Sequence, residues 1–161
     1  MQACPVGGER GLTPGEAALV RSVFGTAIDI AAVRLRRRRW FPLQPRGVTM
    51  APMGHVHFHP DSPNYCEDFA VAPLDAQGLF IHEMTHVWQT QTRGRWYLPL
   101  WRSFSRRYDY ALRPGWRLEQ YGIEQQAEIV RHAFLLRHGV RLAGVSDKRA
   151  YELLVNFAGA G

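Results

Sequence analysis

The stretch His82-Glu83-Met84-Thr85-His86 decides the fold that we expect for this chain of 161 residues. It lies inside an apolar, helix-forming segment, residues 78–91. On a helix, two histidines four residues apart share one face, so both imidazoles can bind a single ion. The spacing suits zinc, and Glu83 lies where its carboxylate can activate a water in the open position of the metal. The alternative is a pair of histidines that only pack within a helix.

The residues around this motif favour a buried helix. Apolar side chains flank it on both sides, and Asp75 is the expected N-cap because it follows Pro73 and Leu74. Gly94 lies near the other end of the pattern. The motif is therefore placed on a helix that packs against the rest of the protein.

A catalytic zinc usually has three protein ligands and a water, so the third ligand must come from elsewhere in the chain. Glu124 is the best candidate, and it begins an amphipathic pattern that continues to Leu136 and ends at Gly139. Glu124 and Glu128 share a helix face, so one can bind the metal while the other accepts the spare N–H of a ligand histidine. This spacing is an ExxxE version of the gluzincin ExxxD, in which the ligand comes first, so Glu124 is preferred. The swapped assignment, with Glu128 as ligand, and a solvated polar face both remain open.

These motifs together resemble the small gluzincin-like zinc metallopeptidases known as Rhs- or Vgr-related proteins, whose bacterial genes often lie near type VI secretion components. The resemblance covers about residues 12–140 and is most specific at residues 82–89 and 124–128. Shorter matching segments are Val23-Phe24-Gly25, Ile28, Val33-Arg34, Met50-Ala51-Pro52, Gly54 and Asp68-Phe69. It implies a minimal gluzincin fold with Zn²⁺ on His82, His86 and Glu124 and with Glu83 as general base. It implies no substrate.

Length and composition fit a single domain over residues 1–161, in which residues 1–11 are expected to be flexible. A hydrophobic content of 46% is enough to form a core. No apolar run is long enough for a transmembrane helix, and the N-terminus lacks the features of a signal peptide. We expect a cytoplasmic protein, with delivery outside the cell by a secretion system as the alternative. Cys4 and Cys66 are expected to be free thiols.

The pattern along the chain predicts an α+β fold. A helix is expected over Pro14–Phe24, because Thr13 and Glu16 form a capping box before an apolar run. A small N-terminal sheet and a last helix complete the expected elements. The strands are Ile28–Leu35, Gly47–Ala51 and His55–Phe58, and the helix is Asp147–Phe157 with Ser146 as its cap.

The formal net charge is +6, and the arginines are densest in two groups. One group is Arg34 and Arg36 to Arg39, followed by Trp40 and Phe41; the other is Arg93, Arg95, Arg102, Arg106 and Arg107. Arginines with aromatic neighbours can bind phosphate backbones or anionic envelope surfaces. The alternative is a solvated edge that protects a sheet. We do not expect nucleic acid to be the partner.

Two further groups of residues are candidates for substrate binding or catalysis. His55, His57 and His59 alternate along one expected strand, so they would share a face and could bind a second metal or border the substrate cleft. A phenol near the zinc often stabilises the oxyanion, and the candidates close to Glu124 in sequence are Tyr108, Tyr110 and Tyr121. Tyr110 is preferred, because Tyr121 is expected to start the second metal helix.

The sequence therefore predicts a single-domain zinc metallopeptidase, a hydrolase that attacks a peptide or protein substrate with a water activated by Glu83. One alternative is a zinc-stabilised adaptor that docks on a secretion spike or envelope polymer. The presence of Glu83 argues against it, because a structural zinc site has no need of a carboxylate beside an open position. Such a site more often closes with a fourth Cys or His. Another alternative is a zinc amidohydrolase acting on cell-wall peptides.

Overall fold

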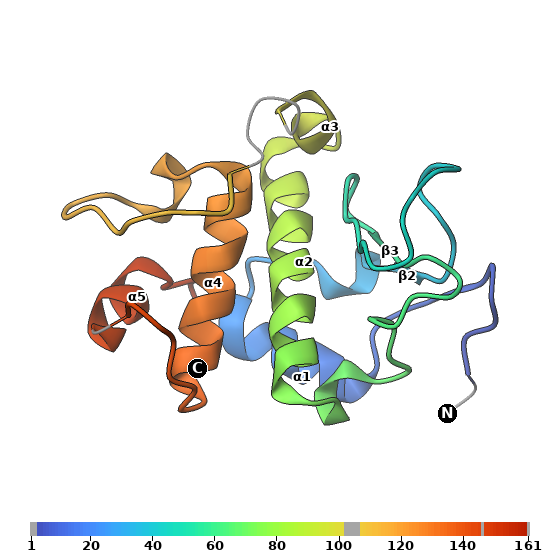
Figure 1. The fold of residues 1–161 in the computed structure, drawn as a ribbon, viewed down its shortest axis with the longest axis horizontal. Helices are drawn as coiled ribbons and strands as arrows, with labels where there is room; N and C mark the ends of the chain where they lie inside the picture. The colour runs from blue at the N-terminus through green and yellow to red at the C-terminus, as the bar shows by residue number, and fades with distance from the viewer. Residues whose placement is uncertain (1–2, 102–106, 146, 161) are drawn as a thin grey trace.

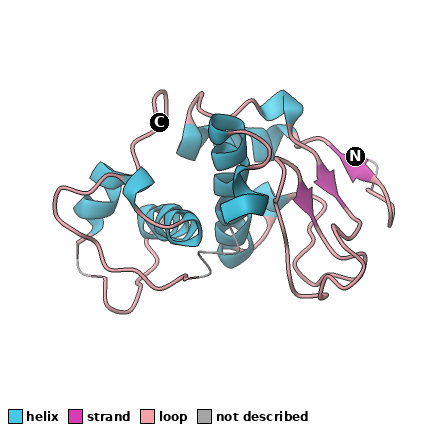
Figure 2. Ribbon diagram, turned by 90° about the horizontal axis from the view of Figure 1, so that it is seen from above, coloured by secondary structure: helices cyan, strands magenta, loops and turns pink. Residues whose placement is uncertain are grey.

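The fold, described by a computed structural model over residues 3–101, 107–145 and 147–160, combines helices with one small sheet. Helices α2 (Leu74–Arg93) and α4 (Ile123–Arg137) lie side by side at the centre (Figure 1). The sheet lies on one side of this pair and α5 lies on the other, as Figure 2 also shows. The remaining elements are β1 (Glu9–Arg10), α1 (Pro14–Phe24), β2 (Leu35–Arg36), β3 (Val56–His57), α3 (Tyr97–Trp101) and α5 (Lys148–Leu154). Within the described ranges, no helix has the length and apolarity needed to span a membrane.

Helix α2 carries the histidine motif through the centre of the core. Its side chains Phe80, Ile81, Met84 and Val87 are buried. The expected N-cap, Asp75, is wrong by two residues: the helix begins at Leu74 with Pro73 as N-cap. Asp75 lies instead in the first turn, where a negative charge interacts favourably with the helix dipole. Gly94 ends the helix at a positive φ of 94°.

Helix α4 packs closely along α2. A Cβ at Gly78 would lie 3.2 Å from Cδ2 of Leu135, so the missing side chain allows the two helices to approach each other there. The apolar face of α4 is buried over Ile129, Val130 and Phe134. The helix expected from Glu124 onward is confirmed and begins one residue earlier, after Gly122. The two helices that carry the candidate metal ligands are thus direct neighbours.

Helix α1 has the predicted bounds and the predicted capping box of Thr13 and Glu16. The Glu16 carboxylate is fully buried and accepts hydrogen bonds in addition to the one within the capping box. Arg10 of β1 donates to both of its oxygens at 2.7 and 2.8 Å, and the Phe69 amide donates to Oε1 at 2.9 Å. Glu16 therefore ties β1, α1 and the 3₁₀ turn Phe69–Val71 together ahead of α2.

The sheet differs from the expected one because its strands are only two residues long. Strand β2 pairs antiparallel with β1 and parallel with β3. The expected strand Ile28–Leu35 is wrong: Ile30–Ala32 form a 3₁₀ turn, because Asp29 caps it by accepting a bond from the Ala31 amide. The expected strand Gly47–Ala51 is reduced to a single bridge between Met50 and His57. Strand β1 lies within residues 1–11, the segment expected to be flexible.

Helix α5 packs on the far side of α4. The expected helix Asp147–Phe157 is shorter, Lys148–Leu154, and Asp147 caps it by accepting a bond from the Ala150 amide at 3.2 Å. Ser146, the cap expected from the sequence, lies outside the described residues. The segment after α5 returns to the end of α1, where the Thr26 amide donates to the Ala158 carbonyl at 3.2 Å.

Candidate metal centre

Three buried side chains from α2 and α4 converge on one point. Oε2 of Glu124 lies 3.2 Å from Nε2 of His86 and 3.4 Å from Nε2 of His82. One ligand atom from each of these residues lies within 4.8 Å of the others. Two imidazole nitrogens and one carboxylate oxygen form a donor set that suits zinc and leaves a fourth position open. The structure thus brings together the residues that the sequence analysis assigned to the metal.

Glu128 lies behind His82, on the side away from this point. Its Oε1 is 2.7 Å from Nδ1 of His82, an ion-pair distance. Glu124 faces Nε2 of both histidines, whereas Glu128 faces the outer nitrogen of one. This arrangement favours Glu124 as the ligand and Glu128 as the partner that orients His82.

The two carboxylates change the electrostatics of His82. Burial opposes the positive charge on this ring, but the bonds to Glu124 and Glu128 outweigh burial and raise the pKa of His82 to about 9. Burial also opposes ionisation of Glu128, but His82 lowers the pKa of this carboxyl below its usual range. A metal needs the unprotonated Nε2, so an ion that binds here must displace a proton.

His86 is oriented by a residue that the sequence analysis missed. Its Nδ1 lies 2.9 Å from Oε1 of Gln89, which accepts the ring N–H and leaves Nε2 free for a metal. The Gln89 amide nitrogen donates to the Ile123 carbonyl at 3.0 Å and to Oε1 of Gln126 at 2.9 Å. The available signal was a polar residue three positions after His86, on the same buried helix face.

Glu83 and His82 both line a cleft of about 400 Å³. Apolar side chains form much of its wall, and Asn64 and Arg131 add polar groups. The apolar wall residues are Val48, Phe58, Phe69, Leu79 and Phe80. A concave, mostly apolar surface with few polar groups is typical of a ligand-binding site.

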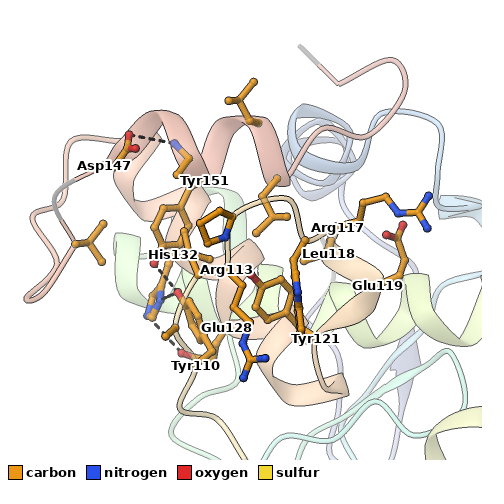
Figure 3. A pocket seen from close by; sticks show the side chains of 18 of the residues that line it. Tyr110, Arg113, Arg117, Leu118, Glu119, Tyr121, Glu128, His132, Asp147 and Tyr151 are labelled. Atoms are coloured by element: carbon orange, nitrogen blue, oxygen red, sulfur yellow. Dashed lines mark hydrogen bonds and ion pairs between the residues drawn. The ribbon is translucent and has the colours of Figure 1, made fainter.

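The tyrosines near the centre are arranged differently from the expectation. The ring of Tyr108 stacks on His82 with centroids 6.3 Å apart, and Tyr108 lines the same cleft. Tyr110 lines a second cavity instead, where its hydroxyl bonds to Nδ1 of His132 and, at 2.8 Å, to the Tyr151 hydroxyl (Figure 3). The Tyr121 hydroxyl accepts from the Arg113 amide. The oxyanion role of Tyr110 therefore stays a prediction without support from its position, and the geometry favours Tyr108.

The histidines around β3 do not form a second metal centre. Within the described residues, the only group with metal-ligand geometry is that of His82, His86 and Glu124. His57 and His59 are buried, and the ring of His57 packs against Trp40.

The arginines of the first basic group are partly paired. Arg36 and Arg38 both contact Oε2 of Glu9 on β1, at 2.9 and 3.1 Å. These contacts fit the reading of the group as a charged sheet edge. In the second group, Arg102 and Arg106 lie outside the described residues.

Comparison with known protein families finds no match. The chain is 39% identical over 159 residues to the type VI secretion system spike protein VgrG2b of Pseudomonas aeruginosa, covering 92% of this chain and 15% of the spike protein. It also resembles the solved effector domain of Pseudomonas aeruginosa VgrG2b, with a TM-score of 0.76 and 35% identity. That match covers 96% of this chain and 88% of the effector domain, whereas the chain spans a small part of the full spike protein.

Proposed function

The chain belongs to the family of the VgrG2b effector domain, and from this premise we propose that it is a zincin-like, zinc-dependent peptidase of a type VI secretion system. The observation that carries the proposal is the convergence of His82, His86 and Glu124 from two adjacent helices. Glu83 stands beside the first ligand and lines the same cleft. This combination of three ligands, an open position and a carboxylate is typical of catalytic rather than structural zinc sites.

The chain's own residues account for binding, orientation and proton transfer. Bound zinc would polarise the scissile carbonyl and make the attacking water more acidic. Glu128 and Gln89 hold the histidine rings so that both Nε2 atoms point to Glu124. Glu83 takes the proton of the attacking water and passes it to the leaving amine. The apolar wall of the cleft limits the access of other water to the reacting bond.

The likeness to a secretion spike protein supports a place of action outside the producing cell. We infer that the domain reaches a peptide or protein substrate after delivery by the secretion apparatus. A cell-wall peptide is the second candidate substrate. The residues of the site favour hydrolysis of an amide bond, but they say less about which kind of molecule contains that bond. An adaptor role is less well supported, since a site that only stabilises the fold needs neither Glu83 nor an open position.

The test combines zinc stoichiometry with hydrolysis of a mixed peptide library and of peptidoglycan fragments. We expect one zinc in the wild-type protein and in Glu83→Gln, and a greatly reduced zinc content in His86→Ala. Of these three proteins only the wild type should cleave, and the cleaved substrate would distinguish a peptidase from a cell-wall amidohydrolase. An exposed carboxylate change, Glu119→Gln, serves as the control and should retain both properties. Equal cleavage by wild type and Glu83→Gln would rule out the mechanism, and a wild type without zinc would rule out the metal site.

A further inference from the structure

A line of polar contacts continues from the candidate metal centre to α5. Oε2 of Glu128 lies 3.5 Å from Nε2 of His132, one turn further along α4. Nδ1 of His132 bonds to the Tyr110 hydroxyl, which in turn lies 2.8 Å from the Tyr151 hydroxyl on α5. The close-up view shows these side chains converging on one another (Figure 3). Together with His82, these contacts connect α2, α4, α5 and the segment before α4.

The donors in this line can all point the same way, toward the metal centre. Burial lowers the pKa of His132, so its ring is neutral and has one N–H. Because Nε2 faces the Glu128 carboxylate, the N–H belongs there and Nδ1 accepts from Tyr110. Burial beside Tyr151 raises the pKa of Tyr110, so its hydroxyl keeps the proton that it donates. The Tyr110 oxygen can then accept from Tyr151, and each donor in the line has an acceptor.

Glu128 borders open space. Its side chain lines a cavity of about 1250 Å³, and Tyr110, His132 and Tyr151 line the same cavity. A carboxylate beside open space can rotate away from His82 unless hydrogen bonds fix it. Arg131 also contacts Glu128, but through Oε1 at 3.4 Å, the oxygen that already faces His82. His132 faces the other oxygen, Oε2.

We propose that His132 and Tyr110 are positioning residues for the metal centre: they hold the Glu128 carboxylate in the orientation that receives the Nδ1–H of His82. This inference rests on the proposed function for the metal itself. It gives Tyr110 a role that differs from the oxyanion contact expected from the sequence. Residues that orient a ligand histidine commonly change metal affinity 10- to 100-fold when they are replaced. Residues one contact further out should have a smaller effect, about 3- to 10-fold.

The experiment measures the zinc dissociation constant by competition with a chromophoric chelator. Tyr110→Phe removes only the hydroxyl, and His132→Leu removes both ring nitrogens. Each should weaken zinc binding by about 3- to 10-fold, whereas His132→Gln, which keeps an N–H donor, should recover much of the affinity. The matched control is Tyr121→Phe, which removes a hydroxyl from the wall of the same cavity without a contact to Glu128 or His132 in the described structure. Its zinc affinity should equal that of the wild-type protein.

Repeating the measurement in a Glu128→Ala protein separates positioning from a general loss of stability. In Glu128→Ala the acceptor is gone, so Tyr110→Phe should have no further effect on zinc affinity. The absorption spectrum of the cobalt-loaded protein should change with His132→Leu and not with Tyr121→Phe, because it reports ligand geometry. Unchanged zinc affinity in Tyr110→Phe and His132→Leu, or an equal effect of Tyr110→Phe with and without Glu128, would overturn the inference. A wild-type protein without zinc affinity would instead refute the proposed function.

Discussion

Gln89 connects the candidate metal centre to the contact between α2 and α4. It is buried, with 1% of its surface exposed, and both ends of its amide are used. The oxygen accepts from His86, while the nitrogen donates to Ile123 and Gln126 on α4. A buried amide with all of these partners satisfied gives one defined arrangement, and an apolar replacement would leave several partners without a bond.

We predict that Gln89→Leu weakens both the fold and the metal site. The free energy of unfolding should fall by about 1 to 3 kcal/mol, because the buried groups that Gln89 bonds lose their partner. Zinc affinity should fall by about 10-fold or more, because the ring of His86 loses its orienting acceptor. Urea unfolding with chelator present and chelator competition measure the two effects separately. Gln91→Leu is the control on the same helix, where the bonds of the side chain to Asp29 are exposed; a loss of zinc affinity as large as that of Gln89→Leu would contradict the role of Gln89.

At the scale of an element, the short strand β3 is held in place by a loop rather than by a long ladder. The side chain of Gln44 is buried and accepts from the Trp40 amide at 2.6 Å. Its nitrogen donates to the Val48 carbonyl and, at 3.2 Å, to the His57 carbonyl of β3. These bonds link the backbones of Trp40 and His57, whose rings pack against each other. Burial and the charge of Arg36 lower the pKa of His57 to about 4.

The buried His57 should make stability depend on pH. Between about pH 4 and 6.5 the unfolded chain binds the His57 proton and the folded protein does not, so stability falls as the pH falls through this range. The contribution is fully present above pH 6.5 and amounts to at most about 3 kcal/mol. In His57→Phe, which keeps a ring in the core, this part of the pH dependence should be absent. Urea unfolding at pH 4.5 and 7.5 tests it, and identical pH slopes for the two proteins would contradict a neutral, buried His57.

At the scale of the whole molecule, the candidate metal ligands come from both central helices. His82 and His86 lie on α2, and Glu124 lies on α4, 38 residues after His86. An ion that binds all three links the two halves of the core directly. Binding to the folded state alone stabilises it by mass action, by about 4 kcal/mol when the free ligand is 1,000 times its dissociation constant.

Metal removal should therefore lower the thermal midpoint of the wild-type protein. We expect a chelator to produce the same large decrease in Glu83→Gln, because Glu83 is not a ligand. Glu124→Gln removes the carboxylate that faces both histidines, so its midpoint should respond much less to chelator. Differential scanning fluorimetry with and without added zinc measures these shifts. A midpoint that is insensitive to chelator in the wild-type protein would show that no ion links the helices.

The end of α1 offers a test of how the C-terminal segment docks. Gly25 has a positive φ of 54°, and a Cβ there would lie 2.1 Å from the Ala158 carbonyl oxygen. Gly25→Ala should destabilise the protein by more than about 2 kcal/mol, because backbone strain and a clash with the returning segment add together. Gly94→Ala is the matched control, since Gly94 also has a positive φ but no atom near the added Cβ. From backbone strain alone it should cost about 1 to 3 kcal/mol, less than Gly25→Ala; equal losses in urea unfolding would show that Ala158 does not pack against Gly25.

The sequence by itself determined the elements whose signals are local. The capping box of Thr13 and Glu16 predicted α1, and helical periodicity predicted α2, α4 and the faces that carry His82, His86 and Glu124. These signals are readable because a helix repeats every 3.6 residues and its caps lie within one turn.

Only the tertiary structure decided how distant residues meet. The strands have two residues each, too few to show an alternating pattern in the sequence. Where a strand was expected, the side chain of Asp29 caps a 3₁₀ turn instead. The positions of Glu124 and Glu128 around the histidines, the bonds of Gln89 to α4, and the separation of Tyr108 from Tyr110 depend on how α2, α4 and the segment before α4 pack. Side chains that are neighbours in sequence can face different cavities, because their directions are set by contacts with residues far away in the chain.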